Sequence, residues 1–278
     1  MHQFEFFLKN FFSALLLCSL MEIGHAETLN NTRSPIDENK WFHQTRLPDG
    51  QSWHNQEQQH YTNRLENAYV SNGLLKIKAK KESFKDQDVV KQYTSARLNS
   101  KFAFTYGRVE VRAKLPKGHG TWPAIWMLPK NISEAGAYFE TQGFGNQSWP
   151  DCGEIDILEH WGKDQNHAQS AIHTRSSHGN TVNLGGQVIP TISSEFHVYA
   201  LDWTAEKLVF SVDGKHHYTY SPTIKNQATW PFDSPQYVLL NFAVEKVIEP
   251  DFTEATFDID YVRIYDDDGA AIFTDEFN

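Results

Sequence analysis

The sequence contains little cysteine, and this excludes a fold held together by disulfide bonds. Its 278 residues include two cysteines, Cys18 and Cys152. Cys18 lies in an N-terminal segment that we expect to be removed, which leaves Cys152 without an intramolecular partner. We expect Cys152 to be a small buried residue rather than a reactive thiol. A hydrophobic core must therefore stabilise the protein unaided.

Positive charge is also scarce. The 25 Lys and Arg residues are outnumbered by 35 Asp and Glu residues, which gives a formal net charge of −10. Binding to a phosphate backbone needs a cationic surface, and this balance does not supply one. The composition therefore argues against a nucleic-acid partner.

Long hydrophobic runs are absent, which argues against a membrane-spanning helix. The most apolar segment, residues 11–21, is shorter than the roughly 20 residues that a spanning helix needs. It follows Lys9 and precedes Gly24-His25-Ala26, whose small residues suit signal peptidase. We predict a signal peptide over residues 1–26, one domain over residues 27–278, and a secreted protein, extracellular or periplasmic. Leu17 directly before Cys18 fits a lipoprotein site poorly, so lipid anchoring is not expected.

Helical periodicity is missing as well, and short strands take its place. Apolar and polar residues alternate over 75–80, 108–115 and 257–265, and a hairpin is predicted at Asp213-Gly214. Many short strands separated by turns indicate an all-β antiparallel sandwich or barrel. Residues 131–149 are expected to form a surface loop, and we find no repeat, linker or second domain.

Aromatic residues are abundant. Eight Trp, 11 Tyr and 19 Phe residues make up 14% of the chain. Such side chains either fill a core or form platforms for flat ligands such as sugar rings. Composition alone does not distinguish these two uses.

The most informative stretch carries three carboxylates. In a regular strand Glu154 and Asp156 share one face, whereas Glu159 points to the other. One extra residue near Ile157-Leu158, a β-bulge, would bring Glu159 to the same face. Two carboxyl groups about 5–5.5 Å apart suit glycoside hydrolysis with retention, and a third can help hold the other two in different protonation states. An acidic edge strand or a calcium site is the alternative interpretation.

Residues 149–162, WPDCGEIDILEHWG, resemble the active-site strand of glycoside hydrolase family 16. Residues 55–62, 93–129, 238–244 and 258–265 also match, so the resemblance extends from about residue 36 to residue 266. It implies a β-jelly-roll sandwich of two curved antiparallel sheets, like concanavalin A, with a concave sugar-binding cleft. It also implies that Glu154 is the nucleophile, Asp156 its assisting carboxylate and Glu159 the general acid/base.

Within this family the chain is most similar to the laminarinases, so we expect a secreted retaining endo-β-1,3-glucanase. Trp122 and Trp126 would line the cleft, with Trp161 beside them, because sugar faces rich in C–H groups pack on indole rings. Core packing is the alternative for Trp126, because it and Ile125 point to opposite faces.

Further candidates lie in the matching motifs. The resemblance implies that Asn55, Glu57, Arg97, His173 and Asn241 hydrogen-bond sugar hydroxyls, while a purely structural role is the alternative for each. His173 is expected near Glu159. His216 and His217 follow a hairpin turn, and we expect both to be exposed.

Other substrates and one other class of function stay open. Mixed-linkage 1,3-1,4-β-glucan and the galactans agarose and carrageenan are the competing substrates, and the acidic balance disfavours sulfated galactan. A β-glucan-binding protein without activity is the other class, but such relatives typically lose catalytic Glu residues. We expect the partner to be a polysaccharide and the protein to be a monomer.

The order of the segments departs from the family pattern. Family members usually begin with a strand resembling WSDEFN before Lys-Trp, whereas here such a strand does not precede Lys40-Trp41 and the chain ends in IFTDEFN. The sequence therefore resembles a circular permutation by one strand, which is tolerated when chain termini lie close together. A coincidental acidic tail is the alternative. We predict a strand over residues 271–277 beside residues 257–265.

The resemblance also implies one possible structural ion. The chemistry requires no cofactor, but family members often hold a calcium ion on the convex face. The matching positions are Gly73, Asp260 and Glu276. Calcium accepts such mixed oxygen ligands.

Overall fold

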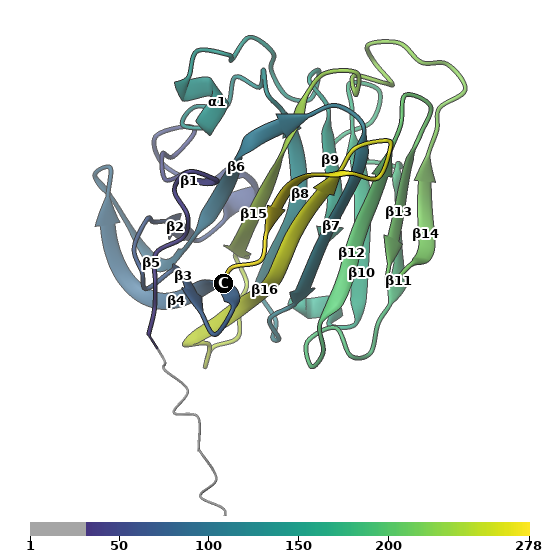
Figure 1. Cartoon of the computed structure of the whole chain (residues 1–278). Helices are drawn as coiled ribbons and strands as arrows, with labels where there is room; N and C mark the ends of the chain where they lie inside the picture. Colours follow the sequence, from purple (N-terminus) through teal and green to yellow (C-terminus); the bar gives the residue numbers. More distant parts are fainter. Residues whose placement is uncertain (1–31) are drawn as a thin grey trace, which may run out of the picture. The chain divides into compact units, whose positions relative to one another are not determined.

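The computed structural model describes residues 32–278, and the predicted signal peptide at residues 1–26 lies outside them. Two large β-sheets pack face to face, as Figure 1 shows, and this confirms the all-β sandwich. No helix within the described residues is long and apolar enough to cross a membrane.

One sheet has seven strands in the order β1-β6-β15-β8-β9-β10-β11. Neighbouring strands in it are antiparallel. The strands are β1 (Trp41–His43), β6 (Arg97–Phe104), β8 (Thr121–Pro129), β9 (Glu154–Glu159), β10 (His167–His173), β11 (Leu184–Val188) and β15 (Gln236–Val244).

The other sheet has ten strands, in the order β14-β13-β12-β7-β16-β4-β5-β2 with β17 beside β16 and β3 beside β4. One of its pairs, β2 with β5, is parallel. The strands are β2 (Gln59–Tyr61), β3 (Ala68–Ser71), β4 (Leu74–Asp86), β5 (Val89–Ser95), β7 (Gly107–Lys114), β12 (His197–Trp203), β13 (Leu208–Val212), β14 (Lys215–Tyr220), β16 (Glu254–Tyr265) and β17 (Ala271–Asp275).

The hydrophobic core is formed by alternate residues of the two sheets. The period-two runs predicted from the sequence lie in the strands β4, β7 and β16, and the predicted hairpin joins β13 to β14. Each sends one set of side chains inward, as alternation along a strand requires. Fully buried core residues include Leu98, Ile125, Ile155 and Leu240 of the seven-stranded sheet and Leu75, Val111 and Leu201 of the ten-stranded sheet.

The predicted C-terminal strand is present. β17 runs antiparallel to β16, with Val262 opposite Asp275 and Ile264 opposite Phe273. The chain end lies beside the turn between β3 and β4, since a Cβ added to Gly73 would be 3.7 Å from Oδ1 of Asn278. The strand prediction is thus confirmed for residues 271–275.

The segment at residues 131–149 is more ordered than the expected surface loop. It contains α1 (Tyr138–Thr141), a single turn, and a bridge between Ile132 and Gln147. Ile132 and Phe139 are buried in a small cluster with Leu128 and Tyr237. The segment therefore folds back on the seven-stranded sheet, on the face opposite the main core.

Candidate active site

A β-bulge in β9 is present at the predicted place. Along β8, Ile125 pairs with Leu158 and Trp126 pairs with Asp156, so that Ile157 is skipped. Ile157 and Leu158 are adjacent in sequence, yet both are buried in the main core. Two consecutive inward residues reverse the alternation, which brings Glu159 to the face that carries Glu154 and Asp156.

Polar residues of neighbouring strands share that face. Asn241 pairs with Arg97 of β6 on one side and with Ala124 of β8 on the other. Ala124 in turn pairs with Glu159 of β9. Because directly paired residues of antiparallel strands point to the same face, these side chains form a row that leads across the sheet to Glu159.

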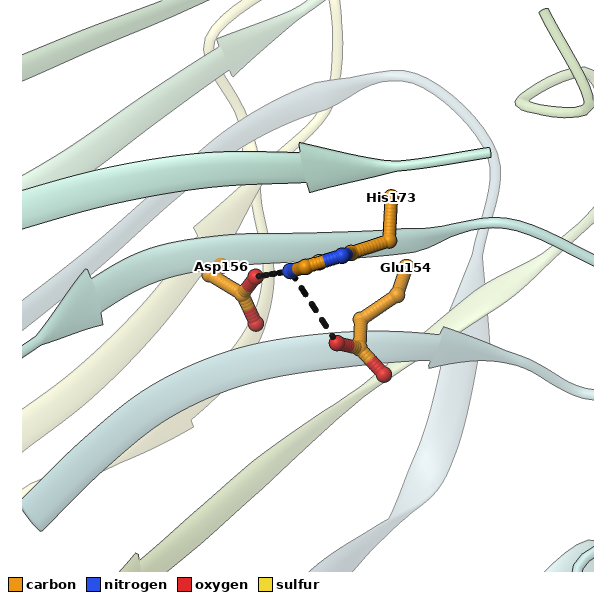
Figure 2. A group of neighbouring side chains, drawn as sticks. All are labelled: Glu154, Asp156 and His173. Carbon is orange, nitrogen blue, oxygen red and sulfur yellow. Dashed lines mark ion pairs between the residues drawn. The ribbon is translucent and has the colours of Figure 1, made fainter. Parts of the chain in front are cut away.

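His173 lies against the first two carboxylates (Figure 2). Its Nε2 is 3.2 Å from Oδ2 of Asp156 and 3.7 Å from Oε1 of Glu154. The backbone N–H of Gly179 donates to its Nδ1 at 3.1 Å, so the ring proton of a neutral His173 is on Nε2, facing the carboxylates. His173 was expected near Glu159; its strand partner is Glu154, because the bulge pairs Glu159 with Gln169, while His173 still lies close enough to Glu159 to interact with it electrostatically.

The three carboxyl groups are held away from water. Burial, and then the charge of Asp156, raises the pKa of Glu154 well above its ordinary value. Burial raises the pKa of Asp156 to about 8. Burial, followed by repulsion from Asp156, raises the pKa of Glu159 to about 8. At neutral pH the group therefore retains protons and does not carry three negative charges.

Two tryptophans stand beside Glu159. Nε1 of Trp122 donates to Oε1 of Glu159 at 3.2 Å. The ring of Trp161, just before η2 (Gly162–Asp164), is tilted against that of Trp122 with 5.5 Å between centroids. Both rings are half-buried. The two rings thus lie beside the carboxylate for which the family resemblance implies the role of proton donor.

Trp126 belongs to a chain of hydrogen bonds on the same face. Its Nε1 donates to Oδ1 of Asn241 at 2.6 Å, and Nδ2 of Asn241 donates to the hydroxyl of Tyr61 at 3.0 Å. Tyr61 donates to Oε2 of Glu57 at 3.1 Å. Trp126 is half-buried while Ile125 is fully buried, so the two point to opposite faces. Trp126 therefore lies outside the main core, although it packs against the small cluster that contains Leu128 and Tyr237.

Arg97 is held between aromatic rings. Its guanidinium carbon lies 4.6 Å from the ring centroid of Trp126 and 5.1 Å from that of Trp53. Its NH2 donates to Oε2 of Glu134 at 2.5 Å, and both side chains are nearly buried. The predicted residue Asn55 follows Trp53 by two positions and is exposed in η1 (His54–Gln56), with a left-handed φ of 56°.

Two residues of this region were missed by the sequence reasoning. Glu134 comes from the segment at 131–149, which was read as a surface loop, yet it pairs with Arg97. Trp149 is 43% exposed, and its ring lies 6.0 Å from that of His173. Its place before the carboxylate strand, within the matching motif, was a signal that could have found it.

The tryptophans divide into two groups. Four are buried: Trp41, Trp53, Trp203 and Trp230. The other four, Trp122, Trp126, Trp149 and Trp161, keep exposed surface. Trp122 contacts Glu159 and Trp161, and Trp149 contacts His173. Trp126 lies opposite Asp156 in the ladder between β8 and β9. Aromatic residues therefore serve both as core and as the surroundings of β9.

The residues expected to bind calcium are engaged in ion pairs. Asp260 accepts a bond from Arg112, and Glu276 accepts two bonds from Arg263 at 2.8 Å. Within the described residues, one group of His and acidic side chains has the spacing of a metal site, namely Glu154, Asp156 and His173. It coincides with the carboxylates already described.

Comparison with known proteins identifies a family with this arrangement. Residues 55–263 match the model of glycosyl hydrolases family 16. The chain belongs to this family. A β-glucanase of Rhodothermus marinus is 36% identical over 91% of this chain and 92% of its own length. The fold and the catalytic class, glycoside hydrolysis, are therefore established, and the chemistry of the family requires no cofactor.

Solved structures of family members agree. LamA from Zobellia galactanivorans, crystallised with laminaritriose and laminaritetraose, is 46% identical and superposes with a TM-score of 0.76 over 84% of this chain and 94% of that one. The laminarinase from Rhodothermus marinus is 38% identical, with a TM-score of 0.72 over 85% and 94% of the two chains. The jelly-roll architecture is thereby confirmed.

Proposed function

We propose that the protein is a secreted, retaining endo-glycosidase that hydrolyses β-1,3-glucan of the laminarin type. The bulged strand β9 carries this proposal, because it gathers Glu154, Asp156 and Glu159 on one face beside partly exposed tryptophans. The laminarinases among the relatives support the choice of substrate.

In this proposal Glu159 is the general acid/base. Its pKa of about 8 keeps it protonated at neutral pH, so that it can protonate the leaving glycosidic oxygen. In the second step the resulting carboxylate takes a proton from water. Trp122 donates to Oε1, which orients the carboxyl group and stabilises its ionised form between the two steps.

Glu154 is then the nucleophile, which attacks the anomeric carbon to form a glycosyl-enzyme that water hydrolyses. Attack requires the ionised form of Glu154, whose pKa is raised by burial and then by the charge of Asp156, so protonation of Asp156 removes the second of these obstacles. A protonated Asp156 and Nε2–H of His173 are the neighbouring donors that stabilise the negative charge on Glu154.

Substrate binding is assigned to the half-buried rings and the polar row. Trp122, Trp126 and Trp161 would stack on sugar rings, because indole faces pack well on pyranose C–H groups. The remaining residues proposed to bind sugar hydroxyls are Asn55, Glu57, Arg97 and Asn241. Existing bonds to protein partners hold the last three in place before substrate arrives.

The test is release of reducing ends from four polysaccharides in parallel: laminarin, barley β-glucan, agarose and carrageenan. We expect the highest kcat/KM on laminarin. Glu154→Gln and Glu159→Ala should each lose nearly all activity, while Glu66→Gln, an exposed control, should retain it. Equal or higher activity on barley glucan or on a galactan would overturn the proposal that β-1,3-glucan is the preferred substrate. Binding of laminarin without release of reducing ends would indicate a binding protein.

Secretion and a monomeric state are further parts of the proposal. The predicted signal peptide over residues 1–26 would be cleaved after Ala26. N-terminal sequencing of the protein recovered outside the cytoplasm tests this, and a retained Met1 would contradict it. Light scattering on the purified protein tests the monomer.

A structural calcium ion at Gly73, Asp260 and Glu276 stays a prediction. The oxygen ligands suit calcium, but binding through both carboxylates requires Arg112 and Arg263 to release them. Melting temperatures measured with calcium and with EDTA test the site. A higher value with calcium supports it, and equal values would remove it.

A further inference from the structure

The bulge in β9 interrupts the pairing of one residue with both neighbouring strands. Neither β8 nor β10 offers a register partner to Ile157, because both ladders skip it. On β10 the pairing passes from Gln169 to Ala171, so Ser170 is skipped opposite the bulge. A bulge is costly unless the groups that it releases find other partners.

Ser170 supplies that partner. Its hydroxyl donates to the carbonyl oxygen of Ile157 at 2.7 Å. Ser170 is 1% exposed, and its strand neighbours Ala168 and Ile172 are buried in the core, so it points between the two sheets. The bulge that brings Glu159 to the active face is therefore held by a side chain of the neighbouring strand β10, from the core side of the sheet.

The hydroxyl is itself oriented by the other sheet. Nε2 of His217, on β14, lies 2.8 Å from the Ser170 oxygen. Since the single Ser170 proton is given to Ile157, the hydroxyl accepts a bond from His217, which places the ring proton on Nε2. Nδ1 of His217 then accepts from Nε2 of Gln187 at 3.3 Å. His217, expected to be exposed, is thus half-buried and bonded on both ring nitrogens.

Burial lowers the pKa of His217 to about 4, with smaller contributions from His216 and His167. The ring is therefore neutral at neutral and mildly acidic pH. A neutral ring with one donor and one acceptor nitrogen matches its two partners.

We propose that Ser170 and His217 are positioning residues that fix the bulge of β9 and thereby set the place of Glu159 relative to Glu154. This rests on the roles given to the two glutamates under the proposed function. Loss of the Ser170 bond frees the carbonyl of Ile157, and Leu158, the one residue between Ile157 and Glu159, then has more than one conformation. The proton donor is misplaced, while Glu154, on the other side of the bulge, stays where it is.

A matched control exists in the same sheet. The ladder between β15 and β6 is also irregular, between Tyr237 and Leu239. There the hydroxyl of Ser100 accepts from the backbone N–H of Val238 at 3.0 Å and donates to the carbonyl of Phe102 at 2.8 Å. Ser100 is fully buried, like Ser170. Ser100→Ala therefore removes the same kind of support from an irregularity that carries no carboxylate.

The experiment compares Ser170→Ala, Ser100→Ala and the wild type on two substrates. Laminarin has a poor leaving group and needs protonation by Glu159. A 2,4-dinitrophenyl β-laminaribioside has a leaving group that departs without a proton, and its kcat/KM reports formation of the glycosyl-enzyme. For Ser170→Ala we expect kcat on laminarin to fall about tenfold or more, as a fraction of what general acid catalysis contributes, with KM nearly unchanged. kcat/KM on the dinitrophenyl substrate should stay within about threefold of the wild type.

Equal losses on both substrates, or the same pattern with Ser100→Ala, would overturn the proposal. His217→Leu serves as the second variant if Ser170→Ala does not fold, because His217 is less buried. It should show the same selective loss on laminarin, and His217→Gln, which retains an N–H donor, should restore part of it. If the wild type is active on neither substrate, the proposed function fails, and the result does not bear on this positioning role.

Discussion

Replacement of Phe277 by alanine should destabilise the whole domain, although this residue is the last but one in the chain. Phe277 is 4% exposed, and its ring lies 6.4 Å from that of the fully buried Trp41. Truncation of a buried Phe to Ala costs about 3–5 kcal/mol, because the transfer energy is lost and a cavity remains. For a domain of this size that corresponds to a fall in Tm of roughly 6–20 °C.

The reason lies in the contacts of β17 with the start of the described chain. Nε1 of Trp41 donates to Oδ2 of Asp275 at 2.8 Å, and Nζ of Lys40 donates to the carbonyl of Thr274 at 2.9 Å. The rings of Phe273 and Trp41 also meet edge to face, 6.0 Å apart. β17 is thus held to Lys40 and Trp41, the neighbourhood that the predicted circular permutation requires, and the permutation itself stays a prediction.

Differential scanning calorimetry of three variants tests this. Phe277→Ala should lower Tm as stated, and deletion of residues 270–278 should lower it at least as much, since Nε1 of Trp41 also loses its partner. Ile272→Ala, in the same strand but 38% exposed, should change Tm by about 2 °C or less. An unchanged Tm in the deletion variant would refute both the stabilisation attributed to Phe277 and the predicted circular permutation.

Three further predictions concern the site. Since burial raises the pKa of Glu159 to about 8, kcat/KM should fall as the pH rises through that value. The contribution of Glu159 to the stability of the fold should be complete below its unfolded pKa and should be lost as the pH rises towards 8. Glu159→Gln should therefore raise Tm at pH 9 but not at pH 4; no difference between the two would count against the raised pKa. Trp122→Phe removes a bond that lowers the pKa of Glu159, so the alkaline limb of the pH–rate profile should move to higher pH, and a move to lower pH would contradict the role of the indole N–H. Arg97→Met should lower the free energy of unfolding, measured by urea denaturation, by about 3–5 kcal/mol, because it leaves the buried charge of Glu134 without a partner. The double variant Arg97→Met with Glu134→Leu should lower it much less. Equal losses in the two variants would show that the charge pair is not the cause.

Local rules predicted most of the fold. The alternation of Val109, Val111 and Ala113 with charged residues identifies β7, because successive side chains of a strand face opposite sides. The same rule showed that Glu159 could join Glu154 only through a bulge near Ile157, and the ladder confirms it. Such inferences succeed because they depend on neighbours within a few residues.

Contacts between distant segments were beyond this reasoning. His217 was expected to be exposed because it follows a hairpin turn, yet it bonds to Ser170, 47 residues away on the other sheet. Glu134 was read as part of a surface loop, yet it pairs with Arg97. His173 was assigned to Glu159 from strand order alone, whereas the one-residue shift at the bulge sets it against Glu154 and Asp156.

The sequence by itself determined the strands, the three carboxylates, the need for a bulge and, through its motifs, the family. Tertiary structure decided which of the eight tryptophans remain exposed, which partners hold Arg97 and Asn241, and what fastens the bulge behind Glu159. The physical reason is one of range. Alternation and turn formation are properties of adjacent residues, whereas burial, pKa and the satisfaction of a free carbonyl depend on which distant strands the two sheets bring together.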